Sequence, residues 1–169
     1  ACEKVLADPG EVGAGPFPTE QDNDTGNRIR QRGKEYGTTT GRPRRCGWLD
    51  AFAVRYAADL SGVSEIALSL LDVLSGFDEI RVCVGYRKNG QDVEDFDPVG
   101  LDGVECVYET LPGWKEELTG CQRFTDLPPA AQRYVTRIEE LVGRPVGLIG
   151  VGPGRENTII HLTRVQGLS

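Results

Sequence analysis

The sequence predicts an α/β fold, with a mostly parallel sheet, flanking helices and one β-hairpin. Three observations support this class: helical and strand patterns alternate, short apolar runs follow helices, and an Asn89-Gly90 pair marks a tight reversal. The 169 residues are enough for one domain with its own core. No apolar run approaches the roughly 18 residues that cross a bilayer, so the sequence predicts no membrane partner.

The first half of the chain predicts two loops and two helices. Residues 1–22 are rich in Gly, Pro and acids and predict a loop, followed by a short polar helix over 24–32 that Gly33 ends. A second loop covers 37–45. Asp50 is expected to cap a helix over 50–61, which ends at Ser61-Gly62. Its apolar stripe is Leu49, Phe52, Ala53, Tyr56, Ala57 and Leu60.

The second half predicts most of the strands and a third helix. Strands are expected near 65–71, 80–87, 104–109, 146–151 and 158–163, with a short return strand of the hairpin near 92–96. Pro128-Pro129 opens a helix over 128–142, and Gly143 ends it. The face that this helix buries is expected to comprise Ala131, Tyr134, Val135, Ile138, Leu141 and Val142.

Charge is unevenly distributed along the chain. The net charge of −7 argues against a nucleic-acid partner or an anionic membrane surface. Between Arg28 and Arg45, however, seven basic residues accompany one acid, a local charge of +6. We interpret Arg28, Arg30 and Arg32 as a solvated face of the first helix, and we expect the second half of the patch to bind an anion.

The segment Thr38-Thr39-Thr40-Gly41-Arg42-Pro43-Arg44 is the most specific feature. Guanidinium forks, hydroxyls and main-chain N–H groups that glycine leaves accessible are the donors that hold carboxylates and phosphates. This loop contains all three kinds. An exposed basic loop would explain the arginines, but it gives no reason for three threonines between glycines. The segment therefore predicts an anion clamp.

Cysteine and histidine usage gives no sign of a metal site. Five cysteines stand at positions 2, 46, 83, 106 and 121, without a Cys-x-x-Cys pair, and His161 is the single histidine. An odd count argues against a paired disulfide set, so reduced thiols and a cytoplasmic location are expected. We interpret the cysteines and His161 as structural, and no metal ligand is predicted.

Five further segments stand out along the chain: residues 13–20 (GAGPFPTE), 38–50 (TTTGRPRRCGWLD), 71–74 (LDVL), 108–114 (YETLPGW) and 137–141 (RIEEL). In this order and spacing they resemble the C-terminal part of adenylosuccinate synthetase. The resemblance runs from about Val12 to Ile160. It implies that residues 1–169 are a single C-terminal segment of a P-loop-NTPase-like synthetase, with residues 1–11 matching poorly and the N-terminal catalytic half absent.

The resemblance implies a GTP-dependent ligase that forms adenylosuccinate from IMP and L-aspartate in AMP biosynthesis, with Mg²⁺ and as a homodimer in the full-length protein. The residues expected to bind aspartate are Thr38, Thr39, Thr40, Gly41, Arg42, Pro43 and Arg44. Arg42 is also expected to reach IMP. The expected GTP-binding residues are Arg44, Leu70, Leu71, Asp72, Gly150, Val151 and Gly152.

This chain departs from the family pattern at the nucleotide segments. Leu70 stands where the family's Thr-Lys-Leu-Asp motif has lysine, and Gly150, Val151 and Gly154 replace two hydroxyls and an acid of Ser-Thr-Gly-Pro-Asp-Arg. The phosphate-cradling loop and the catalytic Asp and His of the family belong to the other half, so no catalytic residue is predicted here. The alternative is a diverged stand-alone module that binds a nucleotide or small anion without catalysis.

Overall fold

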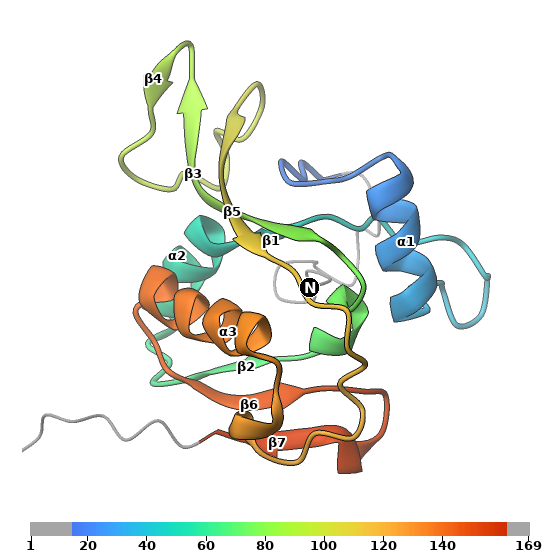
Figure 1. The fold of residues 1–169 in the computed structure, drawn as a ribbon. Helices are drawn as coiled ribbons and strands as arrows, with labels where there is room; N and C mark the ends of the chain where they lie inside the picture. The colour runs from blue at the N-terminus through green and yellow to red at the C-terminus, as the bar shows by residue number, and fades with distance from the viewer. Residues whose placement is uncertain (1–14, 162–169) are drawn as a thin grey trace, which may run out of the picture.

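A computed structural model describes residues 15–161 of the chain. Two small mixed sheets face each other, and the helices α2 and α3 lie between them, while α1 packs at one side (Figure 1). The predictions for residues 1–11, for Gly13-Ala14 and for a strand reaching Thr163 fall at least partly outside the described residues.

The strands form two sheets rather than one. The first contains β1 (Leu49–Asp50), β3 (Glu79–Lys88), β4 (Gln91–Asp92) and β5 (Glu105–Pro112), and the second contains β2 (Ile66–Leu68), β6 (Val146–Gly150) and β7 (Thr158–Ile160). β1 pairs with β3, and β2 with β6, in parallel; the pairings β3–β4, β3–β5 and β6–β7 are antiparallel.

The predicted mostly parallel sheet is therefore wrong. The parallel pairs join strands separated by helices, whereas short reversals near Asn89-Gly90 and after Gly150 turn the chain back beside the strand it has just left. The α/β class itself is confirmed, with three helices and mixed sheets.

The three helices begin and end near the predicted residues. They are α1 (Asp24–Gly33), α2 (Ala51–Ser61) and α3 (Pro129–Val142). The Asp50 carboxylate accepts the Ala53 N–H at 3.0 Å, which confirms the predicted cap of α2. Gly62 and Gly143 end α2 and α3 in left-handed backbone, where glycine avoids the cost that a Cβ adds.

Two predicted strands are shorter in the structure. The expected strand over 65–71 stops at Leu68 because Leu70 has a positive φ of 60° and leads into a 3₁₀ turn, η1 (Leu71–Leu74). The return strand expected near 92–96 is only β4. Phe96 instead folds onto α2, where its ring centroid lies 4.9 Å from that of Tyr56. Two further 3₁₀ turns are η2 (Phe124–Asp126) and η3 (Arg155–Asn157).

The core lies between the sheets, around α3. Ala131, Tyr134, Val135, Ile138 and Val142 of this helix are buried, as the periodicity predicts, and Leu141 packs against them partly buried. The predicted stripe of α2 is less accurate, because Leu60 is 74% exposed at its end. Among the described helices, none has the length and apolarity that a membrane span requires.

Candidate functional site

Helix α1 connects the two regions in which the sequence predicts ligand-binding residues. Near its middle, Arg30 Nε donates to the Arg44 carbonyl oxygen at 2.7 Å, which fixes the end of the threonine–arginine loop, residues 37–45. Near its end, Arg32 Nη2 donates to the Asp72 carbonyl oxygen at 3.2 Å and pairs with Glu117 at 2.9 Å. The helix therefore holds the loop on one side and η1 on the other (Figure 1).

Arg28 and Arg32 are exposed and Arg30 is partly exposed, in agreement with the interpretation as a solvated face, but the three side chains also make structural contacts. Arg28 also has a structural partner, since its guanidinium carbon lies 4.2 Å from the centroid of the Phe77 ring. No local pattern indicates the contacts of Arg28 and Arg32, because Phe77, Asp72 and Glu117 lie 40 or more residues away from the arginines they contact. The partner of Arg30 is the Arg44 carbonyl oxygen, 14 residues away, and a main-chain acceptor carries no residue signature.

The threonine–arginine loop has a closed stalk and an exposed tip. Tyr36 and Pro43 form an antiparallel bridge, and the Gly37 N–H donates to the Arg42 carbonyl oxygen at 2.8 Å. Gly41 donates back to the Gly37 carbonyl oxygen at 2.8 Å and has a left-handed φ of 66°. A Cβ on Gly37 would approach Thr40 Oγ1 to 2.7 Å, so both glycines are required by this tight turn.

The tip presents hydrogen-bond donors to solvent. Thr38, Thr39, Thr40, Gly41, Arg42 and Pro43 are all exposed. Within the described residues, no ion pair or side-chain hydrogen bond engages the Arg42 guanidinium, and the Thr40 hydroxyl only accepts the Arg42 N–H at 3.3 Å. A fork and three hydroxyls are thus free to meet an anion.

Arg44 differs from Arg42. Its Nη1 lies 3.0 Å from Glu35 Oε2, and the Glu35 side chain is only 7% exposed. A buried carboxylate left without its cation is costly, so this pair is expected to hold the base of the loop. Arg44 could contact a nucleotide only if its ion pair with Glu35 opens, or if its guanidinium binds Glu35 and the nucleotide at the same time.

The predicted GTP-binding segments meet at one edge of the second sheet. Leu70, Leu71 and Asp72 follow β2, and Gly150, Val151 and Gly152 end or follow β6, which runs parallel to β2. A Cβ on Gly150 would lie 3.3 Å from the Ser69 Cα and 3.4 Å from the Leu70 nitrogen. The two segments are therefore in contact at the carboxyl ends of parallel strands, the edge where α/β sheets bind ligands.

Asp72 carries an unsatisfied acceptor at this edge. Its Oδ1 atom is buried and has no hydrogen-bond donor among the described residues. Burial raises the pKa of the Asp72 carboxyl above its usual 3.8, and a hydrogen bond from the Asp72 main chain and the Arg32 charge only partly offset this. A buried acceptor without a donor is unusual in folded proteins and fits a group that awaits an N–H-bearing ligand.

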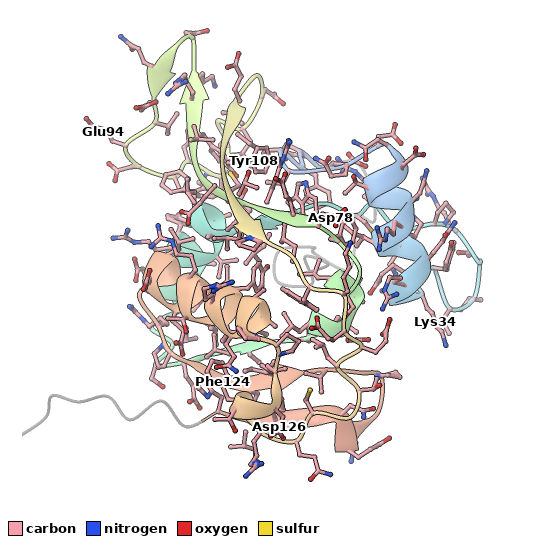
Figure 2. All side chains as sticks on the ribbon, in the orientation of Figure 1. Lys34, Asp78, Glu94, Tyr108, Phe124 and Asp126 are labelled. Carbon is pink, nitrogen blue, oxygen red and sulfur yellow. The ribbon has the colours of Figure 1, made fainter. Side chains whose placement is uncertain are left out.

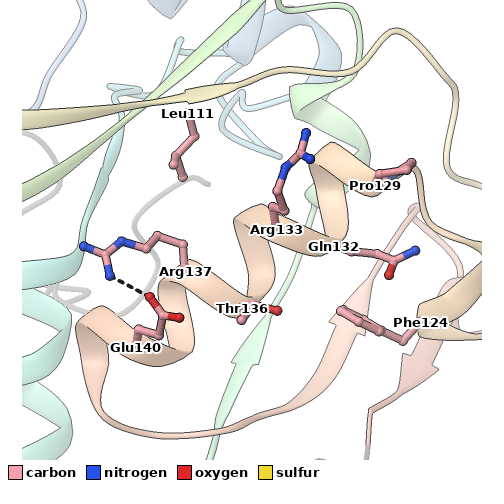
Figure 3. Close-up of a pocket in the computed structure, with 8 residues that line it drawn as sticks. All are labelled: Leu111, Phe124, Pro129, Gln132, Arg133, Thr136, Arg137 and Glu140. Atoms are coloured by element: carbon pink, nitrogen blue, oxygen red, sulfur yellow. Dashed lines mark hydrogen bonds and ion pairs between the residues drawn. The ribbon is translucent and has the colours of Figure 1, made fainter.

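A groove lies elsewhere, along α3. It has a volume of about 540 Å³ and is lined by Leu111, Phe124, Pro129, Gln132, Arg133, Thr136, Arg137 and Glu140 (Figure 3). Arg137 is already paired with Glu109 at 2.9 Å and with Glu140 at 2.6 Å. None of the predicted site residues lines this groove, and the pairing leaves Arg137 little capacity for an anion.

The described residues offer no metal site of their own. Among residues 15–161, no three His, Cys, Asp or Glu side chains gather closely enough to hold a metal ion. The described side chains therefore do not fit a Mg²⁺ site by themselves. His161 is a packing residue, whose ring stacks on Phe124 with centroids 4.1 Å apart.

The family model for adenylosuccinate synthetase matches residues 7–159. The chain belongs to the adenylosuccinate synthetase family. It is 56% identical over 152 residues to the adenylosuccinate synthetase of Desulfitobacterium hafniense and 56% identical over 151 residues to that of Thermomicrobium roseum. These alignments cover 89% and 88% of this chain but only 36% and 35% of the relatives.

A solved structure agrees with this membership. The fully ligated adenylosuccinate synthetase of Plasmodium falciparum superposes with a TM-score of 0.85 at 42% sequence identity, covering 90% of this chain and 37% of that one. The chain thus spans about a third of the length of the synthetases it matches.

Proposed function

We propose that this chain supplies the aspartate-binding loop and the guanine-recognition edge of a GTP-dependent ligase that joins IMP to L-aspartate. Family membership supports the activity. The observation that carries the site is the contact between Leu70–Asp72 and Gly150–Gly152, with the buried, unsatisfied Asp72 Oδ1 beside it.

In this proposal the tip of the threonine–arginine loop holds the carboxylates of L-aspartate. The Arg42 fork pairs with a carboxylate through two parallel N–H groups and also reaches IMP, while Thr38, Thr39 and Thr40 donate hydroxyl hydrogens. These residues are exposed, and no ion pair engages the Arg42 guanidinium within the part of the chain that the structure describes, so binding need not break one. Closure of the tip over aspartate would exclude water from a phosphorylated intermediate.

The Asp72 carboxylate recognises the guanine base by accepting hydrogen bonds from it. Guanine presents N1–H and an exocyclic N2 amine side by side, and a carboxylate accepts from both, whereas adenine lacks this donor pair. Main-chain groups of Gly150, Val151 and Gly152 flank the base, and the Leu70 side chain gives apolar cover without the lysine charge.

The remaining parts of the reaction belong to the complete enzyme. We propose that the phosphate-binding loop, the acid–base residues and the magnesium ligands lie in the part of the synthetase that this chain does not include. A cytoplasmic homodimer is proposed for the complete protein.

The test uses a chimera in which the preceding portion of the Desulfitobacterium hafniense relative is joined to this chain. Formation of adenylosuccinate should require IMP, L-aspartate and GTP. Arg42→Ala should weaken aspartate and IMP engagement by about 2–4 kcal/mol, because each lost bidentate contact leaves a desolvated anion unpaired. Arg42→Lys should recover only part of this loss, since a point charge does not reproduce the fork.

The matched control is Arg81→Ala, which removes an exposed arginine from β3 in the first sheet, outside the threonine–arginine loop. Its aspartate KM should stay within twofold of the unsubstituted chimera. An unchanged aspartate KM in Arg42→Ala would remove the loop from the site, and a chimera that folds but forms no adenylosuccinate would contradict the proposed activity.

A further inference from the structure

A β-bulge in β3 gathers four reactive or titratable side chains on one face of the first sheet. Along β3 and β5, Cys83 stands opposite Tyr108 and Tyr86 opposite Cys106, with the register shift between Cys83 and Gly85. Without the extra residue, Cys83 would share its face with Gly85. The bulge instead places Tyr86 beside Cys83, and Cys106 and Tyr108 share that face because they are two residues apart.

The two cysteines on this face interact with each other. Both are free thiols, and they stand diagonally across the β3–β5 pair, because Cys83 pairs with Tyr108 and Cys106 lies two residues before Tyr108 on the same face. Cys83 is fully buried, and its Sγ donates to the Gly85 carbonyl oxygen at 3.2 Å, whereas Cys106 is partly exposed. Tyr108, at the middle of β5 in Figure 2, lies beside Cys106 on this face. The pair thus has one accessible and one protected thiol.

The surroundings shift the pKa values of the two thiols in opposite directions. The neighbouring Cys83 thiol lowers the pKa of Cys106, and Tyr108 adds to this; burial and the Asp50 carboxylate oppose the shift without cancelling it. The partner thiol, burial and the nearby Asp50 carboxylate together raise the pKa of Cys83. Cys121 provides a contrast, because burial and Asp126 raise its pKa although it too is partly exposed. A thiolate reacts with peroxides far faster than a thiol.

We propose that Cys83 and Cys106 form a peroxide-oxidisable dithiol, in which Cys106 reacts first and Cys83 converts the product into a disulfide. An accessible thiol beside a resolving thiol is the arrangement of redox-sensitive cysteines. The predicted function does not use either residue. The interpretation of all cysteines as structural is thereby revised for this pair.

The reaction balances with a hydroperoxide as the two-electron oxidant. The Cys106 thiolate attacks one peroxide oxygen and the O–O bond breaks; the leaving oxygen takes a proton and departs as water or an alcohol. Cys106 is then a sulfenic acid. Because it no longer carries the negative charge of a thiolate, it no longer opposes ionisation of the Cys83 thiol. The Cys83 sulfur attacks the Cys106 sulfur, the S–O bond breaks, and the hydroxide leaves as water with the Cys83 proton.

Mass spectrometry of the oxidised chain tests this proposal. The 169-residue chain, and in parallel the chimera, is treated with one equivalent of hydrogen peroxide at pH 7.5, alkylated and digested with trypsin. Because the chain has no methionine, peroxide is not consumed by thioethers. We expect peptides 82–87 and 89–115 to be recovered as a disulfide-linked pair, and denatured thiols in the 169-residue chain to fall from five to three and return on reduction.

Two variants separate the pair from the other cysteines. Cys106→Ser should abolish the linked peptides and leave Cys83 reduced, while Cys121→Ser should leave the linkage unchanged. Because Cys106 is partly exposed, its substitution is expected to be tolerated, and near-ultraviolet circular dichroism of the reduced variant checks the fold. Cys106 oxidised to sulfinic acid without linkage, or a disulfide between other cysteines, would overturn the proposal.

Discussion

Asp50 caps α2 and Asp72 lies in the first turn of η1, but the two aspartates differ in their hydrogen bonding. Burial raises the pKa of both carboxyls above the usual 3.8. Asp50, before α2, accepts hydrogen bonds from the Ala53 N–H and from the Tyr86 hydroxyl. Asp72, in η1, keeps one buried oxygen without a donor among residues 15–161. Asp50 is thus satisfied by the fold, whereas Asp72 incurs the cost of burial without full compensation.

The difference separates a structural carboxylate from a ligand-binding one. Both residues lie in segments that resemble the synthetase family. Only the hydrogen-bond partners distinguish them, since a buried acceptor with no donor costs free energy unless a ligand supplies the donor. Replacing Asp50 should therefore mainly lower the free energy of unfolding, whereas replacing Asp72 should mainly weaken ligand binding.

The largest expected effect on stability is that of Asp50→Ala. The substitution removes the cap of α2, worth about 1 kcal/mol, and leaves the buried Tyr86 hydroxyl without its acceptor, at about 1–3 kcal/mol. The free energy of unfolding of the chain should fall by about 2–4 kcal/mol, measured by urea denaturation. Tyr86→Phe in the Asp50→Ala background should cost little more; a full additional loss would show that the two groups act independently.

Asp72→Asn should affect binding rather than stability. In the chimera, GTP affinity should fall by about 2 kcal/mol, because the amide no longer accepts from both guanine donors. The free energy of unfolding at pH 7 should stay within about 0.5 kcal/mol of the original or rise, because a desolvated charge is lost. Calorimetric titration of GTP and urea denaturation measure the two effects. A clear loss of stability with unchanged GTP binding would make Asp72 a structural cap instead.

The pH dependence of stability should reveal the raised pKa of Asp72. Between 3.8 and that raised pKa, the folded state binds more protons than the unfolded state, so stability falls as pH rises through this window. Asp72→Asn removes this contribution. The free energy of unfolding of the variant, minus that of the original chain, should therefore increase as pH rises through the window. Asp78→Asn provides a control of opposite sign, since Lys115 lowers the pKa of Asp78.

The smallest expected effect is that of Leu70→Lys. The substitution restores the residue that the family pattern has, and a lysine stem with its ammonium should cover the guanine base and raise GTP affinity by about 0.5–1 kcal/mol. Fluorescence competition against a GTP analogue in the chimera measures this gain. A weaker affinity would indicate that this nucleotide edge has adapted to apolar cover by leucine.

Local sequence signals predicted the parts of the fold that local chemistry determines. Asp50, Gly62 and Gly143 marked helix ends correctly, because capping depends on residues a few positions away. The strand predicted over 65–71 was too long, because the left-handed Leu70 is imposed by the surrounding packing rather than by leucine itself. The sheet arrangement was mispredicted because pairing is decided between distant segments.

The candidate site shows the same contrast between features set by neighbouring residues and features set by contacts between distant segments. The threonine–arginine loop was recognisable from its residues, whereas the contact of Gly150 with Ser69 and the support of Asp72 by Arg32 depend on tertiary packing. The Cys83–Cys106 pair was missed because its proximity depends on a bulge that no local pattern announces.

The closed stalk of the threonine–arginine loop reduces the entropy that a ligand must remove. The Tyr36–Pro43 bridge and the Arg30–Arg44 hydrogen bond already restrain both ends of the loop. Immobilising a backbone residue costs about 1–2 kcal/mol, so a fully flexible segment over 36–45 would consume much of a small ligand's interaction energy. Here aspartate would have to order only the tip, which leaves most of its contact energy available as affinity.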